Sequence, residues 1–357
     1  MATAHVMGCG YEVLAAARFD IQLQPPLRNS ITMISRILSF SLVALSLLGC
    51  SPGTDSPIQT GSGNSPHRGT IGVSLMTLTN PFFIVIGDTI KKEAQPHGYD
   101  VVVLGADENA DKQNNQVNDF IVQKVDVIVL APYDSRAIGP AIEQAAAVGI
   151  PVFTIDTGCL APDCKVVSHV ATDNKSGGKQ AALAMIEAIG PAGGKIAVLD
   201  HTLTESCLLR IEGFQEFLNQ YNQTADNKIE IVSQLPCGGN RSKGYEATQA
   251  ILQSDGDVVG IFAINDPSAL GAYAALVDAN KQDQVTLIGF DGQPEGKKAI
   301  RDGRIYADPI QFPDRMGVKT VELIMRHFEG EQIEPEYLIQ TELYRKVDAE
   351  NDPSLGS

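Results

Sequence analysis

Apolar runs of strand length alternate with helix-length amphipathic segments along this chain from Gly69 onward. The first run ends at Asn80-Pro81, a turn signal that leaves a proline in the first turn of the next helix. Such runs, separated by helical segments of about ten to fifteen residues, indicate βαβ units and parallel sheets. Strands are predicted at 70–78, 101–104, 125–130, 150–155, 166–170, 195–199, 229–235, 258–264, 285–290, 305–310 and 338–344. Helices are predicted at 84–95, 111–123, 138–148, 177–189, 205–219, 243–253, 267–277, 294–301 and 315–328.

The number of strands sets the domain organisation. About a dozen strands are too many for one comfortable open sheet, so two doubly wound domains are predicted. A closed (β/α)₈ barrel is the alternative at 357 residues, but the strand count overshoots it and no signal supports closure. The predicted fold class is therefore α/β, with two doubly wound, Rossmann-like parallel sheets.

The segment before Gly69 differs in character. Residues 33–49 combine a basic start, a largely apolar run and the ending Leu-Leu-Gly before Cys50. An apolar run of about twelve residues is too short to span a bilayer and is typical of a signal peptide. The ending resembles the lipobox of bacterial lipoproteins, which predicts a lipid on Cys50; an ordinary signal peptide cleaved elsewhere is the alternative.

The two segments flanking this signal are not expected to fold. Residues 1–32 show no periodic pattern and precede a second Met, so we expect translation to start at Met33. Residues 50–68 are rich in Ser, Pro, Gly, Thr and Asn, which predicts a flexible tether between the anchor and the folded body.

Composition and net charge exclude some classes of binding partner. The chain is 43% apolar and 20% charged, which is typical of a globular protein. Its formal net charge of −16 argues against a nucleic-acid-binding surface and against docking on anionic lipid headgroups. We therefore expect no nucleic-acid partner, and membrane contact only through the lipid.

Two adjacent aromatic side chains stand where open parallel sheets bind ligands. Phe82 and Phe83 follow the first strand, at the mouth of a strand-to-helix turn. Consecutive helical residues cannot both face one core stripe, so the pair is predicted to serve a binding site. Packing in the core is the alternative for either ring.

Planar polar side chains follow several other strands, at the edge where the carboxyl ends of parallel strands gather. Such groups can each meet two adjacent hydroxyls, while apolar and aromatic side chains fix the rest of a small ligand. These residues are Asp156, Asp200, Asn265, Asp291 and Gln311, with Arg210 inside a following helix. The alternative for any one of them is a helix N-cap. Asp266, directly before Pro267, is expected to be such a cap, and Asp173 with Asn174 to serve the next helix.

Signals for catalysis or cofactors are poor. The chain has no G-x-S-x-G elbow, P-loop, H-E-x-x-H or C-x-x-C motif, and its histidines share no metal-ligand spacing. Asp156 and Asp291 could form an acid/base pair if they converged, but carboxylates in a ligand cleft also bind hydroxyls without chemistry. We expect no enzyme activity, no cofactor and no metal.

Four cysteines remain in the body of the chain. Cys159 and Cys164 bracket a short Pro-containing loop, Cys207 opens a helix, and Cys237 closes a strand. Disulfides Cys159–Cys164 and Cys207–Cys237 are predicted, as suits an oxidising compartment. Four buried free thiols are the alternative.

Six segments carry a family resemblance. From about Gly69 to Val347 the chain resembles type I periplasmic solute-binding proteins of the ribose-binding, ABC-transporter group. The matching segments are Thr-Asn-Pro-Phe-Phe (79–83), Ile-Pro-Val-Phe-Thr-Ile-Asp (150–156), Arg-Ile-Glu-Gly-Phe (210–214), Phe-Ala-Ile-Asn-Asp-Pro-Ser-Ala-Leu-Gly-Ala (262–272), Gly-Phe-Asp-Gly-Gln-Pro-Glu-Gly (289–296) and Gln-Phe-Pro-Asp (311–314).

The resemblance implies a set of sugar contacts. It assigns ring packing to the aromatic pair and hydroxyl binding to the polar residues Asn80, Asp156, Arg210, Asn265, Asp291 and Gln311. Two departures bear on the ligand. Thr157 is expected to be a ligand residue, but it stands where ribose binders have an Arg. The Thr lacks the bidentate donor pair that the Arg would supply. The third aromatic wall of the ribose site is missing around Gly239, so another sugar or a polyol is expected.

The resemblance also implies connectivity and partners. It places residues 69–171 and 312–340 in one lobe and 172–311 and 341–347 in the other, joined by a three-segment hinge that closes around the ligand. A monomeric, lipid-anchored receptor in the periplasm or cell envelope, delivering a monosaccharide or polyol to an ABC permease, is the leading hypothesis. A sugar sensor for a chemoreceptor or histidine kinase and a carbohydrate enzyme are alternatives. A repressor of this lineage would need an N-terminal helix-turn-helix, which residues 1–68 lack.

Overall fold

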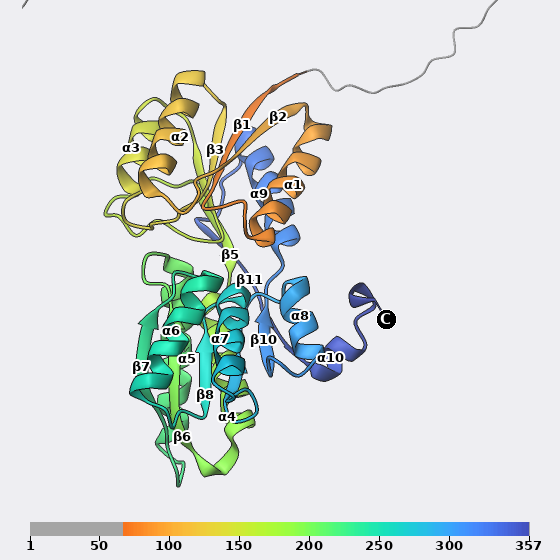
Figure 1. Cartoon of the computed structure of the whole chain (residues 1–357). Coiled ribbons are helices and arrows are strands. Elements are labelled where there is room, and N and C mark those ends of the chain that lie inside the picture. The colour runs from red at the N-terminus through yellow and green to blue at the C-terminus, as the bar shows by residue number, and fades with distance from the viewer. Residues whose placement is uncertain (1–66, 357) are drawn as a thin grey trace, which may run out of the picture. The chain divides into compact units, whose positions relative to one another are not determined.

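The computed structural model describes residues 67–356 (Figure 1). The predicted upstream segment, signal peptide, Cys50 and nearly all of the tether lie outside the described residues. The described strands form two six-stranded sheets, as the alternation of apolar runs predicted.

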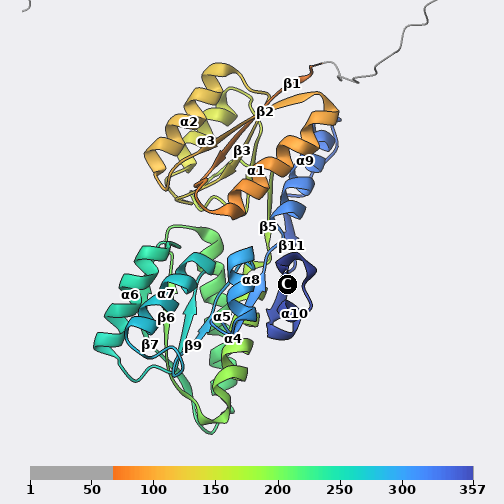
Figure 2. The ribbon, with the colours of Figure 1, turned by 45° about the vertical axis from the view of Figure 1, so that its right-hand side comes forward.

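The first sheet is wholly parallel and has the strand order β11-β5-β4-β3-β1-β2. Its strands are β1 (Gly69–Leu75), β2 (Tyr99–Gly105), β3 (Val127–Ala131), β4 (Val152–Ile155), β5 (Ser168–Thr172) and β11 (Glu336–Ile339). Helices α1 (Pro81–Ala94) and α9 (Pro313–Phe328) lie side by side, and α2 (Ala110–Gln123) and α3 (Gly139–Ala147) form a second pair (Figures 1 and 2). We call this sheet and its helices the first lobe.

The second sheet has the order β12-β10-β9-β8-β6-β7 and is parallel except for β12. Its strands are β6 (Gly194–Asp200), β7 (Ile229–Pro236), β8 (Gly260–Ala263), β9 (Thr286–Ile288), β10 (Ala307–Ile310) and β12 (Glu342–Arg345). Its helices are α4 (Asn174–Ile189), α5 (Glu205–Asn222), α6 (Arg241–Ser254), α7 (Asp266–Asp278), α8 (Pro294–Arg301) and α10 (Lys346–Glu350). This sheet and its helices are the second lobe.

The chain passes from one lobe to the other three times, after β5, after β10 and between β11 and β12. The crossing segments bond to one another, because Asp173 donates its backbone N–H to the Ile339 carbonyl at 2.8 Å. The Thr172 hydroxyl likewise donates to Gln311 Oε1 at 2.7 Å. The three crossings are therefore held together as one hydrogen-bonded joint.

The predicted last strand, 338–344, is wrong as a single element. It is two strands that belong to different sheets, β11 beside β5 and β12 beside β10. The chain leaves the first sheet at Gln340-Thr341, where Gln180 donates to the Thr341 carbonyl at 3.2 Å. No Gly or Pro stands at this break, so the sequence pattern predicted one continuous strand across it.

Several helices begin earlier than the apolar period indicated, because a polar side chain caps each of them. Asn80 caps α1 by accepting from the Phe82 N–H, and Asp173 caps α4 by accepting from the Ser176 N–H, as expected. The predicted cap Asp266 is wrong, because Asn265 has the extended backbone and accepts from the Ser268 N–H. Asp266 instead accepts from the Gln293 N–H at 2.6 Å.

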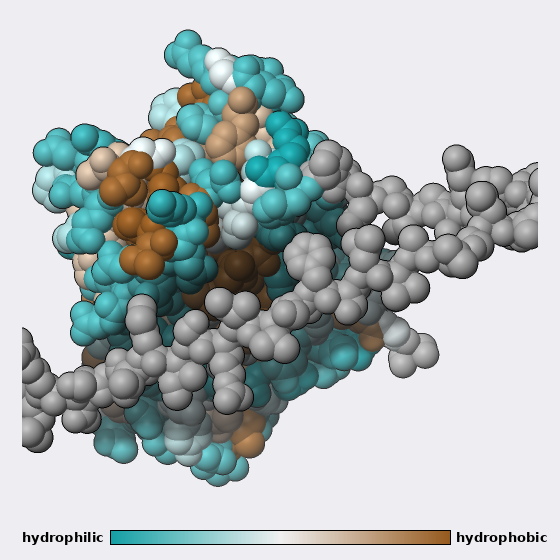
Figure 3. All heavy atoms as spheres, turned by 90° about the horizontal axis from the view of Figure 1, so that it is seen from above, coloured by the Kyte–Doolittle hydropathy of each residue, from teal (hydrophilic) through white to brown (hydrophobic). Residues whose placement is uncertain are grey.

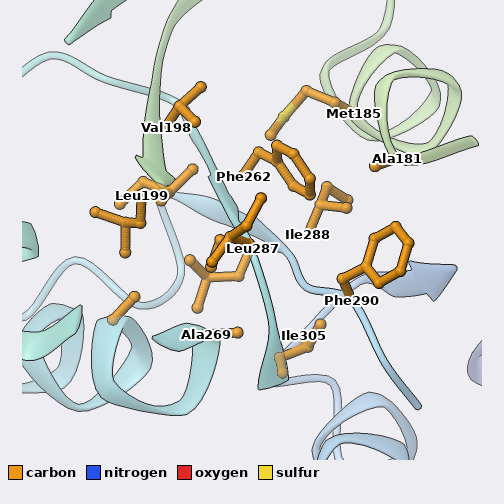
Figure 4. Close-up of a cluster of buried hydrophobic side chains, with 14 of the residues drawn as sticks. Ala181, Met185, Val198, Leu199, Phe262, Ala269, Leu287, Ile288, Phe290 and Ile305 are labelled. Atoms are coloured by element: carbon orange, nitrogen blue, oxygen red, sulfur yellow. The ribbon is translucent and has the colours of Figure 1, made fainter. Parts of the chain in front are cut away.

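The second lobe has one continuous core between its sheet and helices, part of which Figure 4 shows. Phe214 of α5 stacks on Phe262 of β8 with ring centroids 4.5 Å apart, and both are fully buried. Phe290, labelled in the same view, is also fully buried. Burying one such ring contributes about 1.5–3 kcal/mol, so the core fixes the strand ends firmly.

Hydrophilic side chains cover much of the face seen from above in Figure 3, with apolar patches between them. Within residues 67–356, no helix combines the length and apolarity that crossing a bilayer requires.

Candidate functional site between the lobes

A cavity lies between the two lobes and is lined by side chains from both of them. Every predicted ligand residue except Thr157 lines it: Asn80, Phe82, Phe83, Asp156, Arg210, Asn265, Asp291 and Gln311. The structure therefore brings together side chains from six separate segments of the chain.

The aromatic pair forms one wall of the cavity. Phe82 and Phe83 are each 4% exposed, and their rings meet edge to face with centroids 5.2 Å apart. Both rings also pack in the core of the first lobe. The two interpretations of the pair are thus compatible, since each ring is a core side chain with one edge or face on the cavity.

Asp156 brings an unpaired buried oxygen to the site. Its backbone has φ +65°, so the chain turns sharply as it leaves β4. Oδ2 accepts from the Thr157 hydroxyl at 3.3 Å, whereas buried Oδ1 has no hydrogen-bond partner within the described residues. Burial raises the pKa of Asp156 to about 7, against the opposing effect of Arg210. An unpaired buried oxygen is costly, so a ligand hydroxyl would be bound strongly there.

Arg210 is held from three sides. Its Nε donates to Asn174 Oδ1 at 2.8 Å, and its Nη1 donates to the Ile264 carbonyl at 2.9 Å and to Asp291 Oδ1 at 3.2 Å. The guanidinium lies 3.9 Å above the Phe290 ring. Nη2 makes no hydrogen bond to the described part of the chain, so the side chain is fixed with one donor group left over.

Two glycines set the position of this arginine. A Cβ at Gly178 of α4 would lie 2.0 Å from the Arg210 carbonyl oxygen, and a Cβ at Gly213 of α5 would lie 2.0 Å from the Lys175 carbonyl oxygen. Only glycine at both positions allows the two helices to approach so closely. That approach brings Asn174 within hydrogen-bond distance of Arg210.

Asp291 and Gln311 connect the site to the joint. Gln311 Nε2 donates to Asp291 Oδ1 at 2.6 Å, and its Oε1 accepts from Thr172 at the end of β5. Asp291 has φ +106°, a strained value of the kind found at binding sites. Burial raises the pKa of the Asp291 carboxyl above its ordinary value, although the neighbouring Arg210 cation opposes this rise.

Asn265 is a lining residue whose carboxamide already bonds to the protein through both its oxygen and its nitrogen. Its Oδ1 caps α7, and its Nδ2 donates to the Gly239 carbonyl at 3.0 Å. Gly239 has φ +66°, and a Cβ there would lie 2.9 Å from Asn265 Nδ2. The wall at Gly239 is therefore bare backbone, and the cap alternative for Asn265 is correct alongside its place in the lining.

Thr157 does not line the cavity. It is fully buried behind Asp156, and its hydroxyl lies 2.7 Å from the Ser206 hydroxyl of the second lobe. Its predicted contact with the ligand stays a prediction, and the cavity lining does not support it. Its small side chain instead orients Asp156 and joins the two lobes.

The cysteine prediction is half right. Cys159–Cys164 is a disulfide with a Cα–Cα distance of 6.4 Å, which confirms that pair. Cys207–Cys237 is wrong, because both are buried free thiols. The Cys237 thiol lies within hydrogen-bond distance of two acceptors, the Asp200 carbonyl at 3.3 Å and the Ser268 hydroxyl at 3.2 Å, and Cys207 lines the cavity. Burial raises the pKa of Cys207 to about 11, which keeps it an unreactive thiol.

Sequence reasoning missed part of the lining. The missed residues are Met76, Thr77, Glu108, Tyr133, His201, Thr204, Ser206, Cys207 and Gly238. Tyr133 follows β3 and His201 follows β6, so the rule that found Asp156 also applied to them. His201 carries no metal-ligand spacing in the sequence, yet it is only 7% exposed and lines the cavity. Within the described residues no cluster of His, Cys, Asp or Glu could hold a metal ion.

The chain matches the model of the periplasmic binding protein domain over residues 71–332. It belongs to this family.

Similar proteins agree with the match. The ribose import binding protein of Salmonella typhimurium LT2 is 36% identical over 287 residues, covering 80% of this chain and 94% of that protein. An ABC transporter solute-binding protein of Mycobacterium smegmatis, solved with bound glycerol, is 32% identical with a TM-score of 0.73, covering 79% and 96% of the two chains. One from Actinobacillus succinogenes, solved with bound D-allose, is 26% identical with a TM-score of 0.72, covering 80% and 100%. The expected family and its type I fold are thereby confirmed.

Proposed function

We propose that this chain is the substrate-binding component of an ABC-type sugar importer and binds a neutral monosaccharide or polyol between its lobes. The observation that carries the proposal is the buried Asp156 carboxylate, whose Oδ1 faces no protein partner in a cavity shared by both lobes. Relatives named for ribose import or solved with D-allose or glycerol support the same ligand class.

The polar groups of the cavity favour an uncharged ligand. Arg210 already donates to Asn174, Ile264 and Asp291, so only Nη2 remains for a ligand. Glu108, Asp156 and Asp291 also line the cavity, which disfavours an anionic sugar. Hydroxyls that donate to carboxylates and accept from Nη2 suit this set best.

Binding without turnover is the simplest account of these groups. Asp291 is engaged by both Arg210 and Gln311, so it is not placed as a free acid or base opposite Asp156. The relatives named above are binding proteins, which agrees with a receptor rather than an enzyme.

The remaining parts of the proposal concern the setting. We place the receptor in the bacterial periplasm or cell envelope as a monomer, anchored by a lipid on Cys50 after removal of residues 33–49. The lobes, 69–171 with 312–340 and 172–311 with 341–347, would close by rotation at the three crossings, and an ABC permease would take the ligand from the closed form. A sensor presenting sugar to a chemoreceptor or histidine kinase is the second candidate, since the same closure would serve it.

A thermal-shift and calorimetric screen tests the function. The protein from residue 51 onward is titrated with pentoses, hexoses, deoxysugars, cyclic polyols and, as controls, sugar phosphates and uronic acids. We expect saturable binding of at least one neutral sugar or polyol with a stoichiometry of one, and none of the anionic controls. Absence of binding by every neutral member, or tighter binding of the anionic ones, would refute the proposal.

A further inference from the structure

One end of the cavity carries an aromatic pair that the sugar contacts inferred above do not use. Tyr133 follows β3 in the first lobe, and His201 follows β6 in the second. Their ring centroids lie 5.8 Å apart with 37° between the planes, and both residues line the cavity. The pair therefore bridges the lobes across one end of the site.

The polar atoms of this pair are not used by the protein. The backbone N–H of Tyr133 is bonded to Gln113 Oε1, but its hydroxyl makes no hydrogen bond to any described residue. Neither ring nitrogen of His201 has a hydrogen-bond partner in residues 67–356. Glu108, which lines the cavity beside them, also has an unbonded carboxylate in the same part of the chain.

The chemistry of these groups suits a hydroxyl. Burial, with a smaller effect of Lys243, lowers the pKa of His201 to about 4, so the imidazole is neutral at physiological pH. A neutral imidazole offers one donor and one acceptor, and a phenol can also both donate and accept. A hydroxyl placed between them would satisfy its own donor and acceptor capacity.

Two glycines lie next to His201 in the lining. Cys237 donates its backbone N–H to the Asp200 carbonyl at 2.8 Å, so Gly238 and Gly239 follow directly beside the His201 segment. Both have positive φ, at 57° and 66°, and both line the cavity. At Gly239 a Cβ would lie 2.9 Å from Asn265 Nδ2, so the lining beside His201 is backbone that no side chain fills.

The cavity holds more polar groups without a protein partner than the hydroxyls on one edge of a sugar ring can bond. Buried Asp156 Oδ1 and Arg210 Nη2 form one set of groups without a protein partner in the described residues. The Tyr133 hydroxyl, the His201 imidazole and the Glu108 carboxylate form a second set, of which Tyr133 and Glu108 are half-buried. A ligand that reached both sets would make more hydrogen bonds than one that reached only the first.

We propose that Tyr133 and His201 form a specificity subsite for an exocyclic hydroxymethyl group, so that the receptor selects hexoses over the matching pentoses. This inference rests on the proposed function, because it names the ligand class of the same cavity. Tyr133 and His201 act here as contact residues for the substituent, whereas Asp156 and Arg210 bind the ring hydroxyls that both sugar classes share.

Three sugar pairs differ only by that group: D-allose and D-ribose, D-glucose and D-xylose, D-galactose and L-arabinose. Calorimetry on the wild-type protein, Tyr133→Phe and His201→Ala tests the subsite. Tyr306→Phe and His97→Ala are matched controls, since both residues are exposed and lie outside the cavity lining.

For the pair that binds, we expect the wild type to prefer the hexose by at least about tenfold, the usual value of one well-placed buried hydrogen bond. Each subsite variant should weaken hexose binding about five- to tenfold and change pentose binding by less than about twofold. The controls should match the wild type.

Three outcomes overturn the inference: a wild-type pentose affinity equal to or above that of the hexose, equal losses for both sugars, or no loss for either. The wild-type ratio decides the matter even where a variant fails to fold. Binding of no sugar by any form would instead contradict the proposed function itself.

Discussion

The substitution Asp156→Asn separates the contribution of this carboxylate to sugar affinity from its cost to the free energy of unfolding. Asp156 is 4% exposed, and Asn has nearly the same shape and tolerates the positive φ of this position. The substitution removes a charged acceptor from the cavity and leaves the backbone turn intact.

The effect on stability follows from the raised pKa. The ordinary pKa of 3.8 rises to about 7 in the native protein, so between these values the folded chain binds a proton that the unfolded chain does not. Stability therefore falls as pH rises from about 4 to 7, by an upper limit of about 4 kcal/mol at 1.36 kcal/mol per pKa unit. Asp156→Asn should abolish this pH-dependent loss of stability. The ligand-free variant should therefore be more stable at pH 8 than the ligand-free wild type.

The effect on binding has the opposite sign. A hydrogen bond to a charged group contributes about 1.5–3 kcal/mol, so sugar affinity at pH 8 should fall about 10- to 150-fold in the variant. Urea unfolding at pH 5 and pH 8, together with calorimetry on the sugar found by screening, measures both quantities.

Asp163→Asn is the matched control, because Asp163 also has a positive φ but is exposed. It should change neither the pH dependence of unfolding nor the affinity. If Asp156→Asn lowered stability at pH 8, or left sugar affinity unchanged, the assignment of Asp156 as a buried, ligand-facing carboxylate would be refuted.

Three further substitutions test the supports of the site. Arg210→Ala leaves Asp291 buried without its cation, so it should destabilise the protein by about 3–5 kcal/mol in urea unfolding and abolish sugar binding; a loss under 1 kcal/mol would contradict the buried ion pair. Glu205 of the second lobe accepts from the Gly158 N–H of the first lobe at 3.2 Å, so Glu205→Ala should shift the ligand-free protein toward the open form in small-angle scattering; an unchanged scattering curve would show that this contact does not hold the lobes together. Gly178→Ala places a methyl group 2.0 Å from the Arg210 carbonyl, so it should lower both stability and affinity, and an unchanged affinity would show that the α4–α5 approach does not position Arg210.

The architecture could be predicted from the sequence because parallel α/β units repeat in a local pattern. Apolar runs and the helices between them predicted both sheets, and strand-end residues such as Asp156, Asp291 and Gln311 predicted the cavity lining. The rule works because the carboxyl ends of parallel strands meet at one edge.

Local pattern failed where a distant contact decided the outcome. The pairing of Cys207 with Cys237 rested on neighbouring strands, but Cys237 bonds instead to Asp200 and Ser268. Thr157 follows Asp156 in the chain, yet its hydroxyl turns away from the cavity toward Ser206.

The division between sequence and structure is clearest at the two ends of the cavity. Strand periodicity and the Asn-Pro-Phe-Phe turn determined that a polar and aromatic site would lie at the strand ends. Only the tertiary structure placed Tyr133 beside His201, because that contact joins two lobes across 68 residues of chain, and no local pattern records such a distance. Burial, which decides whether a carboxylate or an imidazole is charged, is likewise a property of the folded lobes together.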